Sequence, residues 1–128
     1  MRRLLAFAAC SLATPLFAAS HTVNVGPGVS YSPATLTIAL GDTVRFRNRG
    51  GLHNVVADDL SFRCARGCDG TGGNGAPSSD LWFVDIVFNQ LGEVGYYCEQ
   101  HGSPTDGMRG TIVVLPSTPV DLQSFTID

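Results

Sequence analysis

Apolar and polar residues alternate along most of the chain beyond residue 20, and no window keeps a helical period. Runs that suit short strands cover residues 21–25, 35–38, 43–47, 52–56, 81–88, 94–98 and 109–115. In the third run, Val44 and Phe46 share one face, while the arginines on either side of Phe46 share the other. That arrangement is typical of a strand with one solvated face. Glycine-containing turns separate the runs, so the pattern predicts an all-β protein built as a sandwich or barrel.

Three segments do not follow this alternation. Residues 57–80 are rich in Gly, Asp and Ser, and the pattern assigns no regular structure to them. Residues 102–107 contain two glycines and a proline, and we expect them to be irregular. The tail, 116–128, is compatible with an added edge strand or with a disordered extension.

The first 20 residues have the composition of an export signal. Arg2 and Arg3 are followed by an apolar stretch at 4–12 and by small residues at 18–20. The stretch is too short to cross a bilayer as a helix. We therefore expect a signal peptide at 1–20, one domain at 21–115 and a C-terminal extension at 116–128. The mature protein should not be inserted in a membrane, and it should be located in the periplasm or, alternatively, outside the cell.

Without the signal, about 108 residues remain, which is enough for one domain with its own core. Six basic residues then face 11 acidic ones, a formal charge of −5. An acidic domain of this kind is not expected to bind nucleic acid.

Three cysteines remain after the signal, an odd number for an exported protein. Cys64 and Cys68 are close together in a Gly-rich segment, and a local disulfide between them is the favoured pairing. Cys98 is then a single thiol in an oxidising compartment. A bound metal would occupy it, whereas an inert buried thiol is the simpler alternative.

Soft and nitrogen ligands gather around this cysteine. Cys98, His101 and Met108 lie on one segment between two predicted strands, and His53 comes from a separate strand end. Two imidazoles and a thiolate, with a weak thioether, suit both oxidation states of copper. The set therefore predicts one copper ion that cycles between Cu(I) and Cu(II).

In these features the chain resembles the cupredoxins, the small blue (type 1) copper proteins, and within them the plastocyanin group. The resemblance rests on residues 36–38 and 41–44, His53-Asn54-Val55, Tyr96-Tyr97-Cys98 with His101, Gly107-Met108 and Gly110. It implies a Greek-key β-sandwich of about seven or eight strands, and metal ligation by His53, Cys98, His101 and Met108. It also implies that Asn54 ties the two ligand segments together by hydrogen bonds.

The resemblance further implies an electron carrier, not an enzyme, that meets a donor and an acceptor protein transiently as a monomer. Two features depart from the plastocyanin pattern. Six residues separate His101 from Met108, a longer gap than is usual there, and the segment with Cys64 and Cys68 is an insertion. These departures indicate an exported bacterial relative.

Two alternatives remain at this stage. The first is copper delivery or storage. The second is a copper oxygenase that uses His21 at a mature N-terminus, but only His53 and His101 are left to complete such a site. Multicopper catalysis needs more histidines than the three in the chain.

Overall fold

The structure is a computed structural model that describes residues 18–117. The predicted signal peptide at 1–20 and extension at 116–128 therefore lie almost entirely outside the described residues. The first strand begins at Ser20, and the amide of Ala19 already donates a hydrogen bond to Asp42. No helix in the described part of the chain is both long enough and apolar enough to span a membrane.

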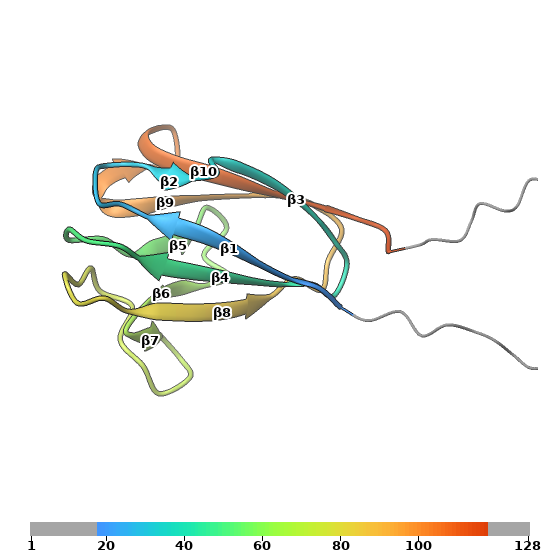
Figure 1. Ribbon diagram of the computed structural model, residues 1–128, viewed down its shortest axis with the longest axis horizontal. Coiled ribbons are helices and arrows are strands. Elements are labelled where there is room, and N and C mark those ends of the chain that lie inside the picture. Colours follow the sequence, from blue (N-terminus) through green and yellow to red (C-terminus); the bar gives the residue numbers. More distant parts are fainter. Residues whose placement is uncertain (1–17, 118–128) are drawn as a thin grey trace, which may run out of the picture.

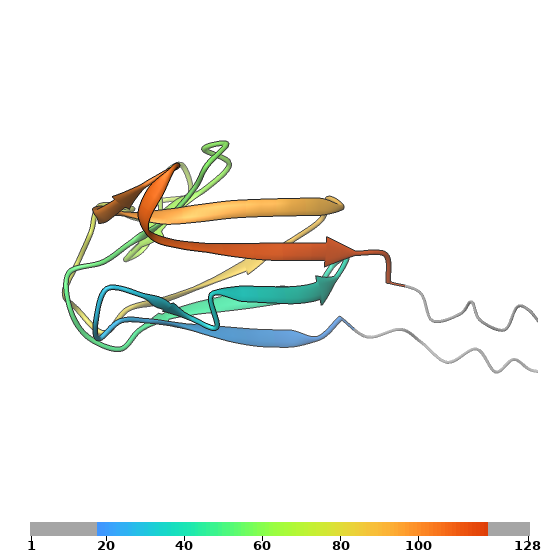
Figure 2. The ribbon, with the colours of Figure 1, turned by 90° about the horizontal axis from the view of Figure 1, so that it is seen from above.

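The described residues form ten strands in two sheets that face each other as a sandwich (Figures 1 and 2). The first sheet has the order β2-β1-β4-β8, with β1 (Ser20–Val25), β2 (Tyr31–Ser32), β4 (Thr43–Asn48) and β8 (Phe83–Val87). The second has the order β3-β10-β9-β5-β6-β7, with β3 (Thr35–Ala39), β5 (Val55–Ala57), β6 (Arg63–Ala65), β7 (Gly67–Cys68), β9 (Gly92–Ser103) and β10 (Asp106–Leu115). The all-β sandwich is confirmed. The sheets contain more strands than expected, because the very short strands β2, β6 and β7 add to the number.

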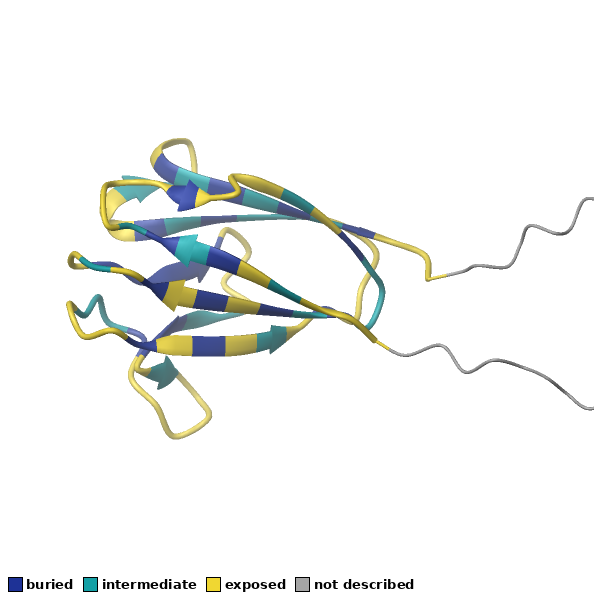
Figure 3. Cartoon of the chain, in the orientation of Figure 1, coloured by how far each residue is buried: buried dark blue, intermediate teal, exposed yellow. Residues whose placement is uncertain are grey.

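Side-chain alternation explains why each sheet has one buried face. Along β4, Val44 and Phe46 are buried whereas Arg45 and Arg47 are exposed, as the pattern predicts, and Figure 3 shows the resulting bands along β4 and β8. Tyr96 of β9 is fully buried and meets Phe46 edge to face, with ring centroids 5.1 Å apart. The core therefore lies between the two sheets.

The expectation that residues 102–107 are irregular is wrong. The strand β9 continues to Ser103, β10 begins at Asp106, and Gly107 pairs with Gly102. Only the two residues Pro104 and Thr105 form the turn. A side chain on Gly107 would collide with Gly102 and with the carbonyl of His101, so glycine allows the strands to approach here.

The Gly-rich segment 57–80 also contains regular structure. Cys64 of β6 pairs with Val55 of β5, and β7 pairs back onto β6, so the segment extends the second sheet. A disulfide joins Cys64 to Cys68, as expected from their proximity in sequence. This short hairpin is thus continuous with the strand that contains Cys98, through β5.

The connections β4–β5 and β9–β10 lie at one end of the sandwich, and the described termini leave at the other (Figure 1). His53 lies in the first of these connections, and His101 lies near the second. The predicted ligands are therefore gathered at the end remote from the termini.

Candidate metal centre

Three of the predicted ligands meet at this end. One ligand atom each from His53, Cys98 and His101 lies within 4.8 Å of the other two, the one such group found among the described residues. The Nδ1 atoms of both imidazoles lie 3.8 Å from the Cys98 sulfur, and the two rings are 5.0 Å apart. Cys98 is fully buried and forms no disulfide. The cluster is therefore two ring nitrogens aimed at one buried thiol.

A break in the β9–β10 ladder produces this arrangement. Arg109 pairs with Tyr97 and Gly107 pairs with Gly102, so Met108 alone stands opposite the four residues 98–101. Such a bulge frees side chains from the regular alternation and turns them in new directions. It places Cys98 and His101 on one strand, and Met108 on the other, within a few residues of the same break.

The spacing of the donors fits a metal ion. Two ligands of one ion, with bonds of about 2.0–2.3 Å and an angle of about 120°, lie about 3.8 Å apart. This is the separation between the Cys98 sulfur and each Nδ1 atom. A thiolate with two imidazoles is also the donor set that stabilises copper in both oxidation states.

His53 is held rigidly with its Nδ1 atom toward the sulfur. The residue is 1% exposed, and its Nε2 atom lies against backbone without a hydrogen bond of good geometry. A methyl group on Gly51 would lie 2.6 Å from Nε2, and Gly51 has a positive φ of 92° that disfavours other residues. Burial lowers the pKa of His53, and the nearby His101 ring acts in the same direction. Both effects favour the neutral ring, which is the form that ligates a metal.

His101 differs from His53 because it is exposed to solvent. One imidazole next to the thiol is therefore buried inside the protein, and the other lies at its surface. A centre built in this way is shielded from water but is reachable through the His101 ring.

Asn54 links the two segments that contain the imidazole and the thiol. Its Oδ1 accepts a hydrogen bond of 2.9 Å from the amide of Glu99, the residue after Cys98. Its Nδ2 donates to the carbonyl of Gly75 and to the Glu99 carboxylate, both at 2.8 Å. Its own carbonyl accepts from the Tyr31 hydroxyl at 2.7 Å. Asn54 is fully buried, so these bonds fix its position.

Met108 occupies the bulge as a buried side chain, 3% exposed, in the hydrophobic cluster that also includes Cys98. A thioether in this place can act as core filler or as a weak ligand. The gap between His101 and Met108 consists of the paired residues on either side of the Pro104–Thr105 turn and the turn itself.

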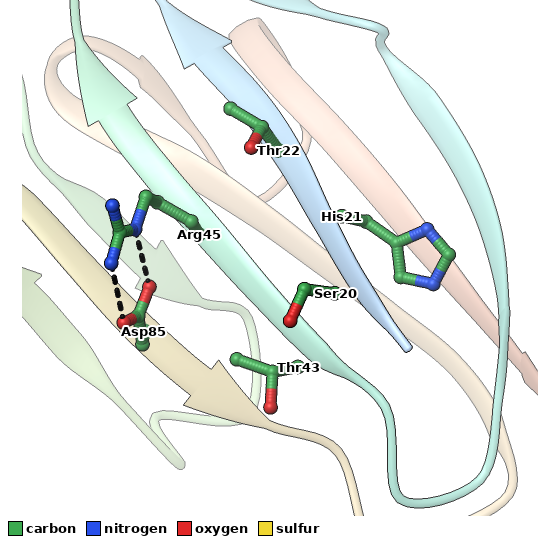
Figure 4. A pocket seen from close by; sticks show the side chains of 6 residues that line it. All are labelled: Ser20, His21, Thr22, Thr43, Arg45 and Asp85. Carbon is green, nitrogen blue, oxygen red and sulfur yellow. Dashed lines mark hydrogen bonds and ion pairs between the residues drawn. The ribbon is translucent and has the colours of Figure 1, made fainter. Parts of the chain in front are cut away.

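His21 does not join the cluster. Its Nε2 atom lies 2.9 Å from the Asp42 carboxylate, near the start of β1. The distance along β1 from His21 to Val25 is about 13 Å, and the metal centre lies beyond that end of the strand. In Figure 4 the His21 ring projects away from Ser20, Thr22 and Arg45, on the other side of the strand. The geometry required for the oxygenase alternative is therefore not formed.

The charged residues around Asn54 were not predicted from the sequence. Arg63 donates from Nε to the Glu99 carboxylate at 2.9 Å and from Nη1 to Asp69 at 2.7 Å. The position of Glu99 directly after Cys98 was the one available signal. Arg63 and Asp69 had none, since they lie in the segment to which no structure was assigned.

Comparison with known protein sequences finds plastocyanins among the relatives. The chain is 35% identical over 109 residues to the chloroplast plastocyanin of Chlamydomonas reinhardtii, covering 81% of this chain and 74% of that protein. It is 32% identical over 111 residues to that of Tetradesmus obliquus, covering 85% and 75%. No protein-family model matches the chain.

Solved structures of amicyanin variants have the same fold. A reduced, Cu(I) form at pH 4 aligns with a TM-score of 0.53 and 25% identity, over 75% of this chain and 82% of the other. An oxidised variant aligns with a TM-score of 0.54 and 26% identity, over the same shares.

Proposed function

This chain belongs to the plastocyanin family of small blue copper proteins, and on this premise we propose that it carries single electrons between redox partners, with one type 1 copper ion as cofactor. The observation that carries the proposal is the pair of 3.8 Å separations between the Cys98 sulfur and the two Nδ1 atoms. The amicyanin structures in reduced, Cu(I) and oxidised forms support the same cofactor chemistry.

The ligand set that we propose is His53 Nδ1, Cys98 Sγ and His101 Nδ1, with the Met108 thioether as a weaker fourth ligand. Met108 is supported as a ligand by its place in the bulge opposite residues 98–101 and by its burial in the same hydrophobic cluster as Cys98. When bound to this set, copper changes between Cu(I) and Cu(II) with little rearrangement, because the donors suit both states.

Residues around the centre hold the ligands in place and leave one ligand accessible to a partner protein. The buried ring of His53 and the buried Cys98 thiol exclude water from one side of the centre. Asn54 holds the backbone after Cys98 in place. His101, at the surface beside Gly102 and Pro104, offers a ring edge through which a partner protein can exchange an electron. A fixed donor set with one exposed ligand suits fast exchange in a brief encounter.

We propose that the protein works outside the cytoplasm, in the periplasm, as a monomer that meets its donor and acceptor transiently. It is an electron carrier and not an enzyme. The export-type composition of residues 1–20 and the disulfide of Cys64 support an oxidising compartment.

Addition of Cu(II) to the apoprotein tests the cofactor. We expect an intense visible band from charge transfer between the Cys98 thiolate and copper, and Cys98→Ser should abolish it while far-UV circular dichroism stays unchanged. A wild-type protein that binds Cu(II) without colour would contradict the proposal.

Met108 can be tested separately. Met108→Leu conserves volume, so the unfolding free energy should change by less than about 1.5 kcal/mol. As a ligand, Met108 would still affect the Cu(II) electron paramagnetic resonance spectrum and the reduction potential, whereas core filler would leave both unchanged. Cyclic voltammetry of the same samples tests electron carriage, because copper delivery or storage requires transfer of Cu(I) but no reversible one-electron wave.

A further inference from the structure

The hairpin β6–β7 contains none of the proposed ligands, yet hydrogen bonds connect its first residue, Arg63, to the residue after Cys98. Arg63 donates to Glu99 and Asp69, and the Asp69 carboxylate accepts from the amide of Gly75 at 2.7 Å. The carbonyl of Gly75 accepts from Asn54, which also donates to Glu99. The five residues Arg63, Glu99, Asn54, Gly75 and Asp69 therefore form a closed ring of hydrogen bonds, which we call the support ring.

The support ring touches both ligand-bearing segments through the backbone. Asn54 directly follows His53, and Glu99 directly follows Cys98. The amide of Glu99 donates to Asn54 Oδ1 within the ring. A displacement of Glu99 would therefore move the peptide attached to Cys98, whereas neither Arg63 nor Asp69 is itself part of the cluster of ligands.

The disulfide holds Arg63 and Asp69 side by side. Cys64 and Cys68 are bonded, and Arg63 and Asp69 are the residues that flank this bonded pair. The amide of Asp69 also donates to the carbonyl of Arg63 at 3.0 Å. Closure of the hairpin thus keeps Asp69 next to Arg63, and Arg63 contacts both Asp69 and Glu99.

We propose that Arg63 and Asp69 are positioning residues for the metal centre, which hold Glu99 against Asn54 and so fix the backbone that follows Cys98. This inference rests on the proposed function for its effect on copper. Arg63 and Glu99 are each about one-third exposed, at 35% and 36%, so their ion pair adds little to global stability. Its effect should instead appear in the local mobility of Glu99 and in the properties of bound copper.

The chain offers a matched control. Arg45 also makes an ion pair with a carboxylate, donating to both oxygens of Asp85 at 2.8 and 3.0 Å, on the outer face of the first sheet (Figure 4). This pair lines a pocket together with Ser20, His21, Thr22 and Thr43, and it has no hydrogen bond to the support ring. Arg45→Met therefore removes an arginine ion pair without disturbing the residues near Cys98.

The experiment compares Arg63→Met with Arg45→Met in two states of the protein. In the apoprotein, hydrogen exchange of the Glu99 amide, measured by NMR, should become about tenfold faster in Arg63→Met and change less than twofold in Arg45→Met. In the copper-loaded protein, the Cu(II) affinity should fall about tenfold in Arg63→Met only. If the affinity for Cu(I) is unchanged, this tenfold loss of Cu(II) affinity raises the reduction potential by about 59 mV.

Equal behaviour of the two variants in both measurements would overturn the inference. Arg63→Lys keeps the charge but not the fork, so it should recover part of the wild-type exchange rate. If Arg63→Met does not fold, Asp69→Asn must show faster exchange at Glu99 than the wild type, and an unchanged rate overturns the inference. A wild-type protein without the visible copper band would contradict the proposed function, while the exchange rates in the apoprotein would still decide the role of Arg63.

Discussion

The two ends of the sandwich each contain a buried polar side chain that makes three hydrogen bonds, but these bonds connect different parts of the chain. At the metal end, Asn54 bonds to Gly75 and twice to Glu99, so it joins the two ligand segments. At the other end, Asp42 accepts from Ala19, His21 and Ala39, so it joins the start of β1 to the β3–β4 corner. A buried side chain with three hydrogen bonds therefore stabilises the metal centre at one end and the strand arrangement at the other.

Replacement of Asn54 should have the largest effect. Asn54 is fully buried, and Asn54→Ala leaves the Glu99 amide and the Gly75 carbonyl without this partner, so we expect a loss of about 3 kcal/mol in unfolding free energy. Copper affinity should fall about 10- to 100-fold, because a partner of the ligand segments is lost. Denaturant unfolding of the apoprotein and competitive copper titration measure the two losses. Unchanged affinity would mean that Asn54 serves the fold alone.

Replacement of Asp42 should affect the fold without affecting the site. Asp42→Ala removes the acceptor of two backbone amides and of the His21 ring, and we expect a loss of about 2 kcal/mol in unfolding free energy. The visible copper spectrum and the reduction potential should remain those of the wild type. A shifted potential in this variant would erase the distinction between the two ends.

Substitution of Gly75 tests how closely the support ring is packed. An added methyl group there would collide with the backbone of Arg63, whereas Gly28, in the loop between β1 and β2, has open space around it. Gly75→Ala should therefore lower the unfolding free energy by about 1 kcal/mol or more, and Gly28→Ala should leave it nearly unchanged. Thermal unfolding of the two apoproteins compares them, and equal melting temperatures would show that the ring tolerates displacement.

The smallest effect is a pH dependence at the Asp42 end. Burial alone would raise the pKa of Asp42, but the hydrogen bonds from His21, Ala19 and Ala39 outweigh it and lower the pKa below its ordinary value of 3.8. Such a carboxylate stabilises the fold above that value, and the contribution is lost as the pH falls through the folded-state pKa. The stability gap between wild type and Asp42→Asn should thus narrow between pH 5 and pH 2.5 in urea unfolding. A constant gap would contradict this assignment.

Strand positions were predictable because burial on one face imposes a period of two. The alternation in β4 is complete, so Val44 and Phe46 were assigned correctly to the core. Phe83, in the predicted strand 81–88, is 54% exposed, and the guanidinium carbon of Arg45 lies 3.9 Å from the centre of its ring. An aromatic side chain at an edge strand can be stabilised by a neighbouring cation, and alternation alone does not reveal this.

The paired strands around the turn at Pro104 were not predictable for a different reason. Glycine and proline usually mark irregular chain, but Gly102 and Gly107 face each other across a tight hairpin. Their absence of side chains is what permits the pairing. Composition therefore indicated a turn of six residues where the chain forms one of two.

By itself, the sequence determined the all-β class and the chemical types of the ligands, because alternation and side-chain chemistry are local properties. Only the tertiary structure decided which nitrogen atoms face Cys98, since that depends on a bulge that sets Met108 opposite four residues of β9. The support ring is likewise a tertiary feature. Arg63 and Glu99 are 36 positions apart in sequence, and the register of β6 on β5 and of β5 on β9 brings them together.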